Sequence, residues 1–443
     1  MPRLVRSSIG RWVDPAVVFT TLFGDQTDVV WLDSGPAATS GKSYLGRGSR
    51  VAITETHASL LEFLRTELAA NRVEDESDGF ALGWVGWVGY ETRFETMGVP
   101  RTQTSQYPDT AFLYLDRAIE FDHGTREVSL LSLGDDDEWR ESVVESLRGG
   151  SFAGSRSGVN SFPELVDERL RAIWRDTDDE YLAKIRACQA AIAAGNAYLL
   201  CLTTEVRVDA APDPVATYLA LRASSPSHHG ALLRVGELAL LSSSPEQFLT
   251  VTPAGLIESR PIKGTRPRGS TDEADVILAA ELAASEKERA ENLMIVDLMR
   301  NDIGRVSRIG SVEVPSLLAV ETYAHVHQLV STVRGQLAEG LDPMDVVVAC
   351  FPAGSMTGTP KSSATRILES LEGAPRGIYS GAFGYFGLDG RIDLAMVIRS
   401  IVISPKGATI GSGGGITALS DPHEELAEVK LKAAALLGVL GAT

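Results

Sequence analysis

The chain has 443 residues, of which 44% are hydrophobic and 23% are charged. This composition is typical of a globular protein with a substantial core, and the length favours two or three domains. The formal charge of −18, from 41 basic and 59 acidic residues, argues against binding to nucleic acid or to an anionic membrane, because both present negative surfaces. A local cationic cleft for an anionic small molecule is compatible with this balance.

The sequence predicts neither a leader segment nor a membrane span. The apolar stretch around 17–23 lacks the core and the cleavage pattern of a signal peptide, and no apolar segment approaches the length of a transmembrane helix. The three cysteines, Cys188, Cys201 and Cys350, are widely spaced and odd in number. We therefore expect buried thiols in the reducing cytoplasm.

The first part of the chain alternates short apolar stretches with turns. Residues 80–90 are rich in glycine, valine and tryptophan, which suits a buried strand better than a helix. The glycine- and serine-rich run 149–158 is the best linker candidate. We predict an N-terminal region 1–148 that contributes strands to a shared core, a linker 149–165 and a catalytic domain 166–443.

The second part of the chain is predicted to form a series of strands interrupted by helices. A helix is predicted over 178–194, capped by the region of Asp176 and Thr177 and ended by Gly195. Further helices are predicted at 274–299, 343–350, 362–371 and 423–440, and strands at 198–206, 231–235, 238–242, 248–251, 381–386 and 397–404. Because strands and helices do not alternate regularly, the pattern predicts an α+β fold with large, mostly antiparallel sheets.

One lysine lies in a constrained run, Ser-Arg-Pro-Ile-Lys-Gly-Thr, at residues 259–265. The ring of Pro261 fixes the φ of that residue at about −65°, and Gly264 permits a sharp bend. Lys263 is therefore predicted to project from a turn. An amine held in this way could act as a nucleophile. Taken alone, the segment would be read as a basic surface loop.

Two of the predicted helices carry pairs of glutamates three residues apart, Glu288 with Glu291 and Glu425 with Glu428. The members of each pair lie on one helix face and repel each other unless a cation lies between them. Four carboxylates suit a hard cation with oxygen ligands, which is Mg²⁺ more than Ca²⁺ or Zn²⁺. Taken singly, each pair is more often a solvated helix face.

Two further features point to an anionic ligand. Residues 411–416, Gly-Ser-Gly-Gly-Gly-Ile, are predicted to form a loop that can present backbone N–H groups to an oxyanion. Arg399 interrupts an apolar strand, and because burial of an unpaired charge is costly, we expect an anionic partner for it.

The run around Lys263 resembles, almost residue for residue, the signature of aminodeoxychorismate synthase component I, in the family of chorismate-utilising enzymes. The resemblance covers most of the chain and is strongest over 198–432. It implies a fold like that of anthranilate synthase component I, with two large antiparallel sheets packed together and helices outside. It also implies amination of chorismate at C4 with ammonia, which gives 4-amino-4-deoxychorismate for para-aminobenzoate and folate biosynthesis.

The resemblance assigns roles to individual residues. It implies that Lys263 attacks C2 of chorismate, that Glu246 protonates the departing C4 hydroxyl, and that the four glutamates hold Mg²⁺ against the ring carboxylate. Glu246 then needs a raised pKa, and Lys263, whose pKa is ordinarily about 10.4, needs desolvation or nearby cations to act as a free amine. The implied substrate contacts are Thr357, Gly358, Tyr379, Arg399, Gly413, Gly414, Gly415 and Lys432.

Two positions distinguish this chain within the family pattern. Leu199 stands where isochorismate and salicylate synthases carry a water-activating lysine, so we do not expect water to be added at C2. Gln328 stands where the family commonly has histidine before Leu-Val-Ser. The neighbouring His327 would face the opposite side of a strand, and we assign neither histidine a role.

No cysteine lies in a Gly-x-Cys-x-Gly elbow, so the chain is not expected to hydrolyse glutamine. The resemblance implies a separate glutamine amidotransferase subunit that delivers ammonia. Two alternatives stay open. One is anthranilate synthase component I, which normally carries alanine in place of Lys263; the other is a catalytically silent subunit that binds chorismate or tryptophan.

Overall fold

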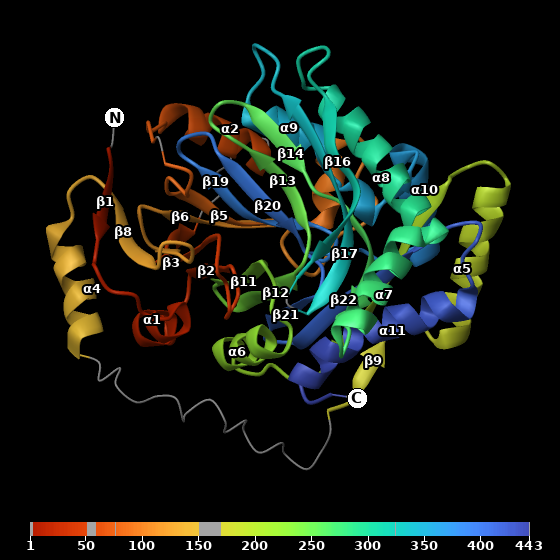
Figure 1. Ribbon diagram of the computed structural model, residues 1–443, viewed down its shortest axis with the longest axis horizontal. Helices are drawn as coiled ribbons and strands as arrows, with labels where there is room; N and C mark the ends of the chain where they lie inside the picture. Colours follow the sequence, from red (N-terminus) through yellow and green to blue (C-terminus); the bar gives the residue numbers. More distant parts are fainter. Residues whose placement is uncertain (1–2, 51–58, 76, 150–169, 324, 443) are drawn as a thin grey trace.

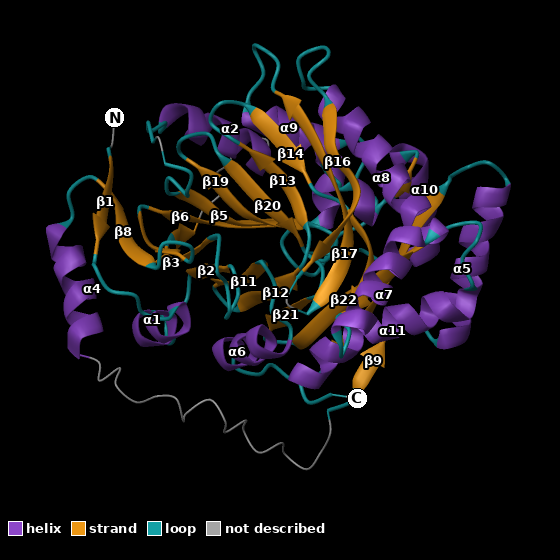
Figure 2. Ribbon diagram, viewed as in Figure 1, coloured by secondary structure: helices purple, strands orange, loops and turns teal. Residues whose placement is uncertain are grey.

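The fold consists of two large antiparallel sheets with helices packed around them (Figures 1 and 2). We describe it in a computed structural model for residues 3–50, 59–75, 77–149, 170–323 and 325–442. The predicted α+β architecture is confirmed. Within the described residues no helix is both long enough and apolar enough to cross a membrane.

The first sheet contains twelve of the described strands. In spatial order they are β1 (Leu4–Ser8), β8 (Glu127–Leu133), β7 (Arg117–Asp122), β3 (Lys42–Arg47), β2 (Val29–Asp33), β11 (His229–Val235), β12 (Leu238–Ser244), β21 (Ser400–Ser404), β22 (Gly407–Ile416), β10 (Leu199–Val208) and β18 (Gly358–Thr359), with β9 (Ala172–Trp174) beside β10.

The second sheet contains ten of the described strands. In spatial order they are β15 (Ile262–Pro267), β17 (Val326–Gln336), β14 (Leu256–Ser259), β13 (Gln247–Val251), β20 (Ile392–Met396), β19 (Ala382–Gly387), β5 (Gly83–Val88), β6 (Thr110–Leu115) and β4 (Ser49–Arg50), with β16 (Glu313–Thr322) beside β17.

Helices cover the outer faces of the sheets. They are α1 (Pro15–Leu22), α2 (Leu60–Ala70), α3 (Arg93–Thr96), α4 (Asp137–Gly149), α5 (Asp178–Ala193), α6 (Pro214–Ser224), α7 (Asp272–Ala284), α8 (Glu286–Gly304), α9 (Pro343–Cys350), α10 (Lys361–Glu372) and α11 (Pro422–Val439), with 3₁₀ turns η1 (Tyr90–Thr92) and η2 (Gly354–Met356).

Strand alternation explains how both faces of the first sheet are buried. Val30 and Leu233 point toward the second sheet, where they pack in one cluster with Trp87 of β5. Their neighbours Trp31 and Leu232 point the other way and pack in the cluster that contains the apolar residues of α1, α6 and α11. Because successive side chains alternate, one strand serves two cores.

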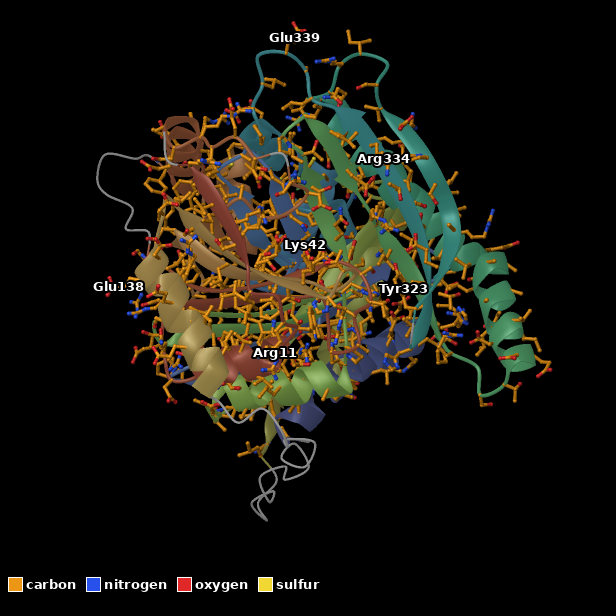
Figure 3. All side chains as sticks on the ribbon, turned by 60° about the vertical axis from the view of Figure 1, so that its left-hand side comes forward. Arg11, Lys42, Glu138, Tyr323, Arg334 and Glu339 are labelled. Carbon is orange, nitrogen blue, oxygen red and sulfur yellow. The ribbon has the colours of Figure 1, made fainter. Side chains whose placement is uncertain are left out.

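Segments from both ends of the chain share each sheet. In the first sheet β2 pairs with β11, and in the second β5 pairs with β19. The predicted linker 149–165 begins at Gly149, the last residue of α4, and its other residues lie outside the described ranges. Figure 3 shows side chains of both charges over one face, including Glu138 on α4, Arg334 on β17 and Glu339 just after it.

The predicted single helix over 274–299 is wrong. The structure has two helices, α7 and α8, which meet at Ser285. Ser285 has an extended backbone, with φ −65° and ψ 113°, and its side chain caps α8 by accepting a hydrogen bond from the N–H of Glu288. This break reorients the chain just before the two predicted metal ligands of α8, Glu288 and Glu291.

Three other local predictions are corrected. The glycine-rich run 411–416 is not a loop but the end of β22, paired along its length with β10. The predicted strand 397–404 begins only at Ser400, because Arg399 has a left-handed φ of 51°. Lys263 lies not in a turn but in β15, where the pairing with β17 shifts register between Ile262 and Thr265.

Candidate active site

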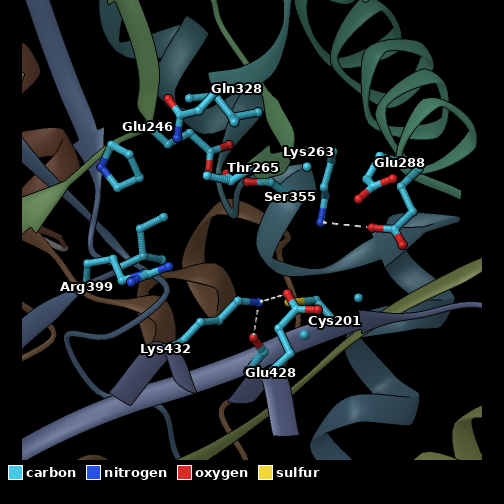
Figure 4. Close-up of a pocket in the computed structure, with 18 of the residues that line it drawn as sticks. Cys201, Glu246, Lys263, Thr265, Glu288, Gln328, Ser355, Arg399, Glu428 and Lys432 are labelled. Atoms are coloured by element: carbon cyan, nitrogen blue, oxygen red, sulfur yellow. Dashed lines mark hydrogen bonds and ion pairs between the residues drawn. The ribbon is translucent and has the colours of Figure 1, made fainter. Parts of the chain in front are cut away.

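A cavity of about 540 Å³ opens among β15 and β17 of the second sheet, β10 and β22 of the first sheet, and the helices α8 and α11. Figure 4 shows Lys263 and Arg399 entering it from opposite sides, with Glu246 and Gln328 along one wall and Glu428 and Lys432 along another. This volume is typical of a small-molecule site. The predicted site residues that line it are Glu246, Lys263, Glu288, Glu291, Tyr379, Arg399, Gly413, Gly414, Gly415, Glu425, Glu428 and Lys432.

Gly264 explains how Lys263 reaches the cavity. Gly264 has a φ of 88°, and a side chain there would come within 2.7 Å of Glu288 and 2.8 Å of Leu282. The glycine therefore lets α7 and α8 approach β15 closely. Lys263 consequently lies beside α8, with its Nζ atom 3.9 Å from Oε2 of Glu291.

The charge state of Lys263 differs from what a nucleophile needs. Burial alone would lower the pKa of Lys263, but the surrounding carboxylates, Glu291 first among them, raise it above its ordinary value. Without a ligand, the amine is therefore held as an ammonium ion. A nucleophilic role requires that Glu291 be neutralised or drawn away.

Glu246 has the properties of a general acid. Burial raises its pKa to about 7, against the opposing effects of the Lys263 charge, the Ser355 hydroxyl and the backbone N–H of Ile262. Its side chain lies among the residues of the cavity wall. A carboxyl group with this pKa is substantially protonated at neutral pH and can give up its proton to a ligand.

Each of the four predicted metal ligands is paired with a basic side chain. The partners at 2.8 Å are Arg266 for Glu288, Lys287 for Glu425 and Lys432 for Glu428, and Glu291 faces Lys263. Burial raises the pKa of Glu291, with Glu425 and Glu428 adding repulsion. No three metal-ligating side chains of the described chain converge, as they stand, into a metal centre.

The donor chemistry of these carboxylates nevertheless fits Mg²⁺. All four line one cavity, and their oxygen atoms are the ligands that this cation prefers. Their present counterions are flexible lysine and arginine side chains. A divalent cation that bound these carboxylates would therefore displace the basic side chains that now pair with them.

The glycines of β22 make room for side chains of other elements. A side chain at Gly411 would lie 2.1 Å from the ring of Tyr379, and one at Gly414 would lie 3.1 Å from Glu425. The carbonyl of Gly413 accepts a hydrogen bond of 2.9 Å from Lys432. We expected an oxyanion loop here, and the structure shows a strand that gives neighbouring groups access to the cavity.

Arg399 is the cationic group of the cavity that lacks a carboxylate partner within the described residues. Burial lowers the pKa of its guanidinium, against the opposing effects of Tyr379 and Glu428. The left-handed backbone at Arg399 turns this side chain out of the sheet. An anionic ligand would supply the missing partner.

Two predicted substrate contacts lie outside the cavity lining. Thr357 is fully buried, and its hydroxyl donates a hydrogen bond of 3.0 Å to the carbonyl of Ala353. Gly358 has a φ of 141° and packs against the backbone of Leu199. They belong to the layer behind Ser355 and Met356, which do line the cavity.

The structure also places Gln328, where the family commonly has histidine, and Leu199, where isochorismate and salicylate synthases carry a lysine. Gln328 lines the cavity, whereas His327 points to the other side of β17 and is hydrogen-bonded to Thr322 and Asp275 at 2.9 Å each. Leu199 is fully buried at the start of β10. The predicted opposite orientation of the two neighbours on β17 is confirmed.

Sequence reasoning missed several polar residues of the cavity. Ser355 hydrogen-bonds Glu246, and Arg266 and Lys287 neutralise predicted metal ligands. A signal existed for Lys287, which directly precedes Glu288 on the helix. The thiol of Cys201 also lines the cavity, and burial raises its pKa.

Residues 27–438 match the family described as chorismate binding enzyme. The chain belongs to this family. It is 42% identical to an aminodeoxychorismate synthase of Streptomyces griseus, over 99% of this chain and 64% of that protein. It is also 38% identical to anthranilate synthase component 1 of Methanothermobacter marburgensis, over 83% of this chain and 76% of the relative.

The chain spans about two thirds of the length of the aminodeoxychorismate synthase of Streptomyces griseus. Among solved structures, anthranilate synthase component I from Streptococcus pneumoniae TIGR4 has a TM-score of 0.78 and 27% identity, covering 98% of this chain and 99% of its own. The isochorismate synthase MenF from Escherichia coli shares the fold, with a TM-score of 0.72 and 19% identity, covering 99% and 95% of the two chains.

Proposed function

We propose that this chorismate-binding chain aminates chorismate at C4 with ammonia to form 4-amino-4-deoxychorismate, the precursor of para-aminobenzoate in folate synthesis. The observation that carries the proposal is Lys263, whose amine projects into the same cavity as Glu246 and Arg399. The 42% identity to an aminodeoxychorismate synthase supports the same reaction.

The chain's own groups can perform the chemistry in two displacements. Lys263, as a free amine, bonds to C2 of chorismate while the ring double bonds shift and the C4 hydroxyl leaves, protonated by Glu246 to give water. Ammonia then bonds to C4, the double bonds shift back, and the C2–N bond breaks to release Lys263. The enolpyruvyl group is retained, so no pyruvate forms.

Substrate binding uses the remaining groups of the cavity. Arg399, which lacks a carboxylate partner in the described residues, would bind the enolpyruvyl carboxylate together with Tyr379. Glu288, Glu291, Glu425 and Glu428 would hold Mg²⁺. Bound there, Mg²⁺ would supply positive charge for the ring carboxylate and would offset the Glu291 charge that raises the pKa of Lys263.

We propose that ammonia comes from a separate glutamine amidotransferase subunit. The three cysteines are buried, and burial raises the pKa of Cys188 and Cys350 to about 12. Such thiols do not supply the thiolate that glutamine hydrolysis by a cysteine nucleophile requires.

The decisive experiment is to identify the product that the purified chain forms from chorismate, Mg²⁺ and ammonium salt. We expect 4-amino-4-deoxychorismate without pyruvate. Anthranilate with stoichiometric pyruvate would instead assign the chain to the reaction named for its 38% identical relative. No turnover, with chorismate still bound, would favour a silent binding subunit.

A further inference from the structure

Arg376 is a buried arginine just outside the cavity whose donors are all satisfied. Its side chain is 1% exposed, and it forms a two-pronged pair with Glu372 of α10, from Nε to Oε2 at 2.9 Å and from Nη2 to Oε1 at 2.7 Å. A buried charge requires such pairing. The carboxylate therefore fixes the plane of the guanidinium.

The other N–H groups of Arg376 reach three separate segments of the cavity wall. Nη1 donates to the carbonyl of Met356 at 2.6 Å and to the hydroxyl of Ser380 at 3.3 Å, and Nη2 donates to the carbonyl of Cys201 at 2.9 Å. Met356 and Cys201 line the cavity, and Ser380 directly follows the cavity residue Tyr379. One rigid group thus sets the relative positions of η2, β10 and the turn before β19.

The N-terminal region holds Arg376 from behind. Its guanidinium carbon lies 4.3 Å from the centre of the Tyr90 ring. The carboxylate of Glu91 accepts hydrogen bonds from the backbone N–H groups of Arg376 and Gly377, at 2.9 and 2.8 Å. The arginine is therefore locked at both its backbone and its side chain.

The wall segments held by Arg376 connect to the reacting groups. Ser355, next to Met356, hydrogen-bonds the general acid Glu246. The N–H of Cys201 donates to the carbonyl of Thr357 at 2.8 Å, which ties β10 to the same segment. A shift of the Arg376 guanidinium would therefore also move Ser355, whose hydroxyl donates a hydrogen bond to Glu246.

We propose that Arg376 is a positioning residue for the chorismate reaction: it fixes the wall segments that carry Ser355, Cys201 and Tyr379. The claim rests on the proposed function for its chemistry. Arginine is required because its five N–H donors lie in one plane, whereas lysine has three donors on a single atom and cannot span the five acceptor sites.

Arg93 provides a matched control. It is also buried, forms an ion pair of 3.0 Å with Glu369 on the same helix α10, and lies 5.2 Å from the same Tyr90 ring. It does not line the cavity. Arg93→Lys and Arg376→Lys therefore make the same chemical change beside the same helix and the same ring, and only Arg376 contacts the cavity wall. The two sites differ in hydrogen bonding, because all donors of Arg376 are used, whereas the buried Nε of Arg93 has no hydrogen-bond partner in the described structure.

The test compares kcat, KM for chorismate and thermal midpoint of both variants with those of the wild type. We expect Arg376→Lys to lower kcat at least tenfold, because small misplacements of reacting groups have large effects on rate, with KM within about threefold. Arg93→Lys should keep kcat within twofold, with a smaller loss of thermal midpoint because fewer hydrogen bonds are lost. Equal kcat losses in the two variants, or a normal kcat in Arg376→Lys, would overturn the proposal.

If Arg376→Lys does not fold, a second variant tests the same proposal. Ser380→Ala removes one acceptor and keeps a Cβ at a residue whose φ is 65°, so backbone strain is unchanged. Because one buried N–H of Arg376 loses its acceptor, we expect kcat to fall about threefold with only a modest loss of thermal midpoint, and an unchanged kcat would refute the positioning role. The wild-type product decides the proposed function separately. If the wild type forms anthranilate instead of the amine, kcat for that product should still fall at least tenfold in Arg376→Lys but not in Arg93→Lys. Equal kcat values, or a wild type that forms no product at all, would refute the positioning role.

Discussion

Leu199 and Lys263 meet beside Gly415: a side chain at this glycine would lie 3.2 Å from Cδ1 of Leu199 and 3.4 Å from Nζ of Lys263. The Oε2 atom of Glu291 would be equally near, at 3.4 Å. The Lys263 amine thus has an apolar neighbour, Leu199, at the position where the family resemblance would place a water-activating lysine in isochorismate and salicylate synthases. The absence of a side chain at Gly415 leaves room for all three groups.

We predict that Gly415→Ala disturbs catalysis more than stability. The added methyl group forces Leu199 to give way by a few tenths of an ångström and touches the Lys263 amine and the Glu291 carboxylate at ordinary van der Waals distance. We therefore expect kcat to fall about tenfold, with a change in unfolding free energy of about 1 kcal/mol. Gly438→Ala on α11, where a side chain meets nothing within 4 Å, is the control. Normal kcat in Gly415→Ala would show that this close contact is unimportant.

Lys263→Ala and Lys263→Arg should both lose C4 amination by a factor of at least 10². Arginine keeps a positive charge opposite Glu291 but cannot act as a nucleophile at accessible pH. Mass spectrometry of the wild-type enzyme quenched during turnover should find the substrate mass on the Lys263 peptide. An active Lys263→Arg variant would mean that the charge, and not a covalent bond, is what the reaction uses.

Glu291→Gln and Glu428→Gln should each weaken Mg²⁺-dependent chorismate binding at least tenfold while leaving the fold intact. Each change removes one oxygen charge from the proposed ligand set, and the Mg²⁺ titration of chorismate affinity measures the effect. Glu281→Gln is the control, because Glu281 also contacts Arg266 but is 57% exposed and does not line the cavity. Full activity after exhaustive chelation would exclude the metal.

The pH dependence of kcat/KM should reflect the ionisation of the Glu246 carboxyl group. Its protonated form is the acid, so kcat/KM, corrected for the concentration of NH₃, should fall as pH rises above about 7. Ser355→Ala removes a hydrogen bond that favours the ionised carboxylate, and the fall should move to higher pH. Glu246→Gln should lower the rate by a factor of about 10²–10⁴ and abolish the fall of kcat/KM above about pH 7. If the fall persists in this variant, another group causes it.

The same carboxyl group also affects stability. Its folded-state pKa of about 7 exceeds the ordinary 4.5, so the folded protein binds more protons than the unfolded chain between these values. The stability contribution of Glu246 is therefore lost as pH rises from 4.5 to about 7. Denaturant unfolding of Glu246→Gln should show a flatter dependence across this window than the wild type.

The purified chain should use ammonium salt at high pH, where NH₃ is abundant, and ignore glutamine. A glutaminase subunit added in trans should restore glutamine use near neutral pH. Without ammonia, isochorismate and salicylate should be at most trace products, because Leu199 offers no base. Product chromatography under these conditions checks both expectations, and glutamine-dependent amination by the chain alone would contradict the first.

Much of the candidate site could be predicted from sequence because its groups occur in compact motifs. Glu288 and Glu291 are three residues apart, and the run around Lys263 is continuous. The counterions could not be predicted: Lys287 reaches Glu425, 138 residues away, only because α8 approaches α11. The break at Ser285 was missed because both flanking segments have helical composition, and one capping side chain decides the boundary.

The interleaving of the two sheets has a consequence for the chain as a unit. The lining of the cavity runs from Cys201 to Lys432, so a fragment of the second half would carry the whole reactive apparatus. Such a fragment would nevertheless expose the edges of β11 and β19, which β2 and β5 cover, and would lose Tyr90 and Glu91 behind Arg376. Unpaired strand edges promote aggregation. We therefore expect the reaction to require the N-terminal region, although none of its described residues lines the cavity.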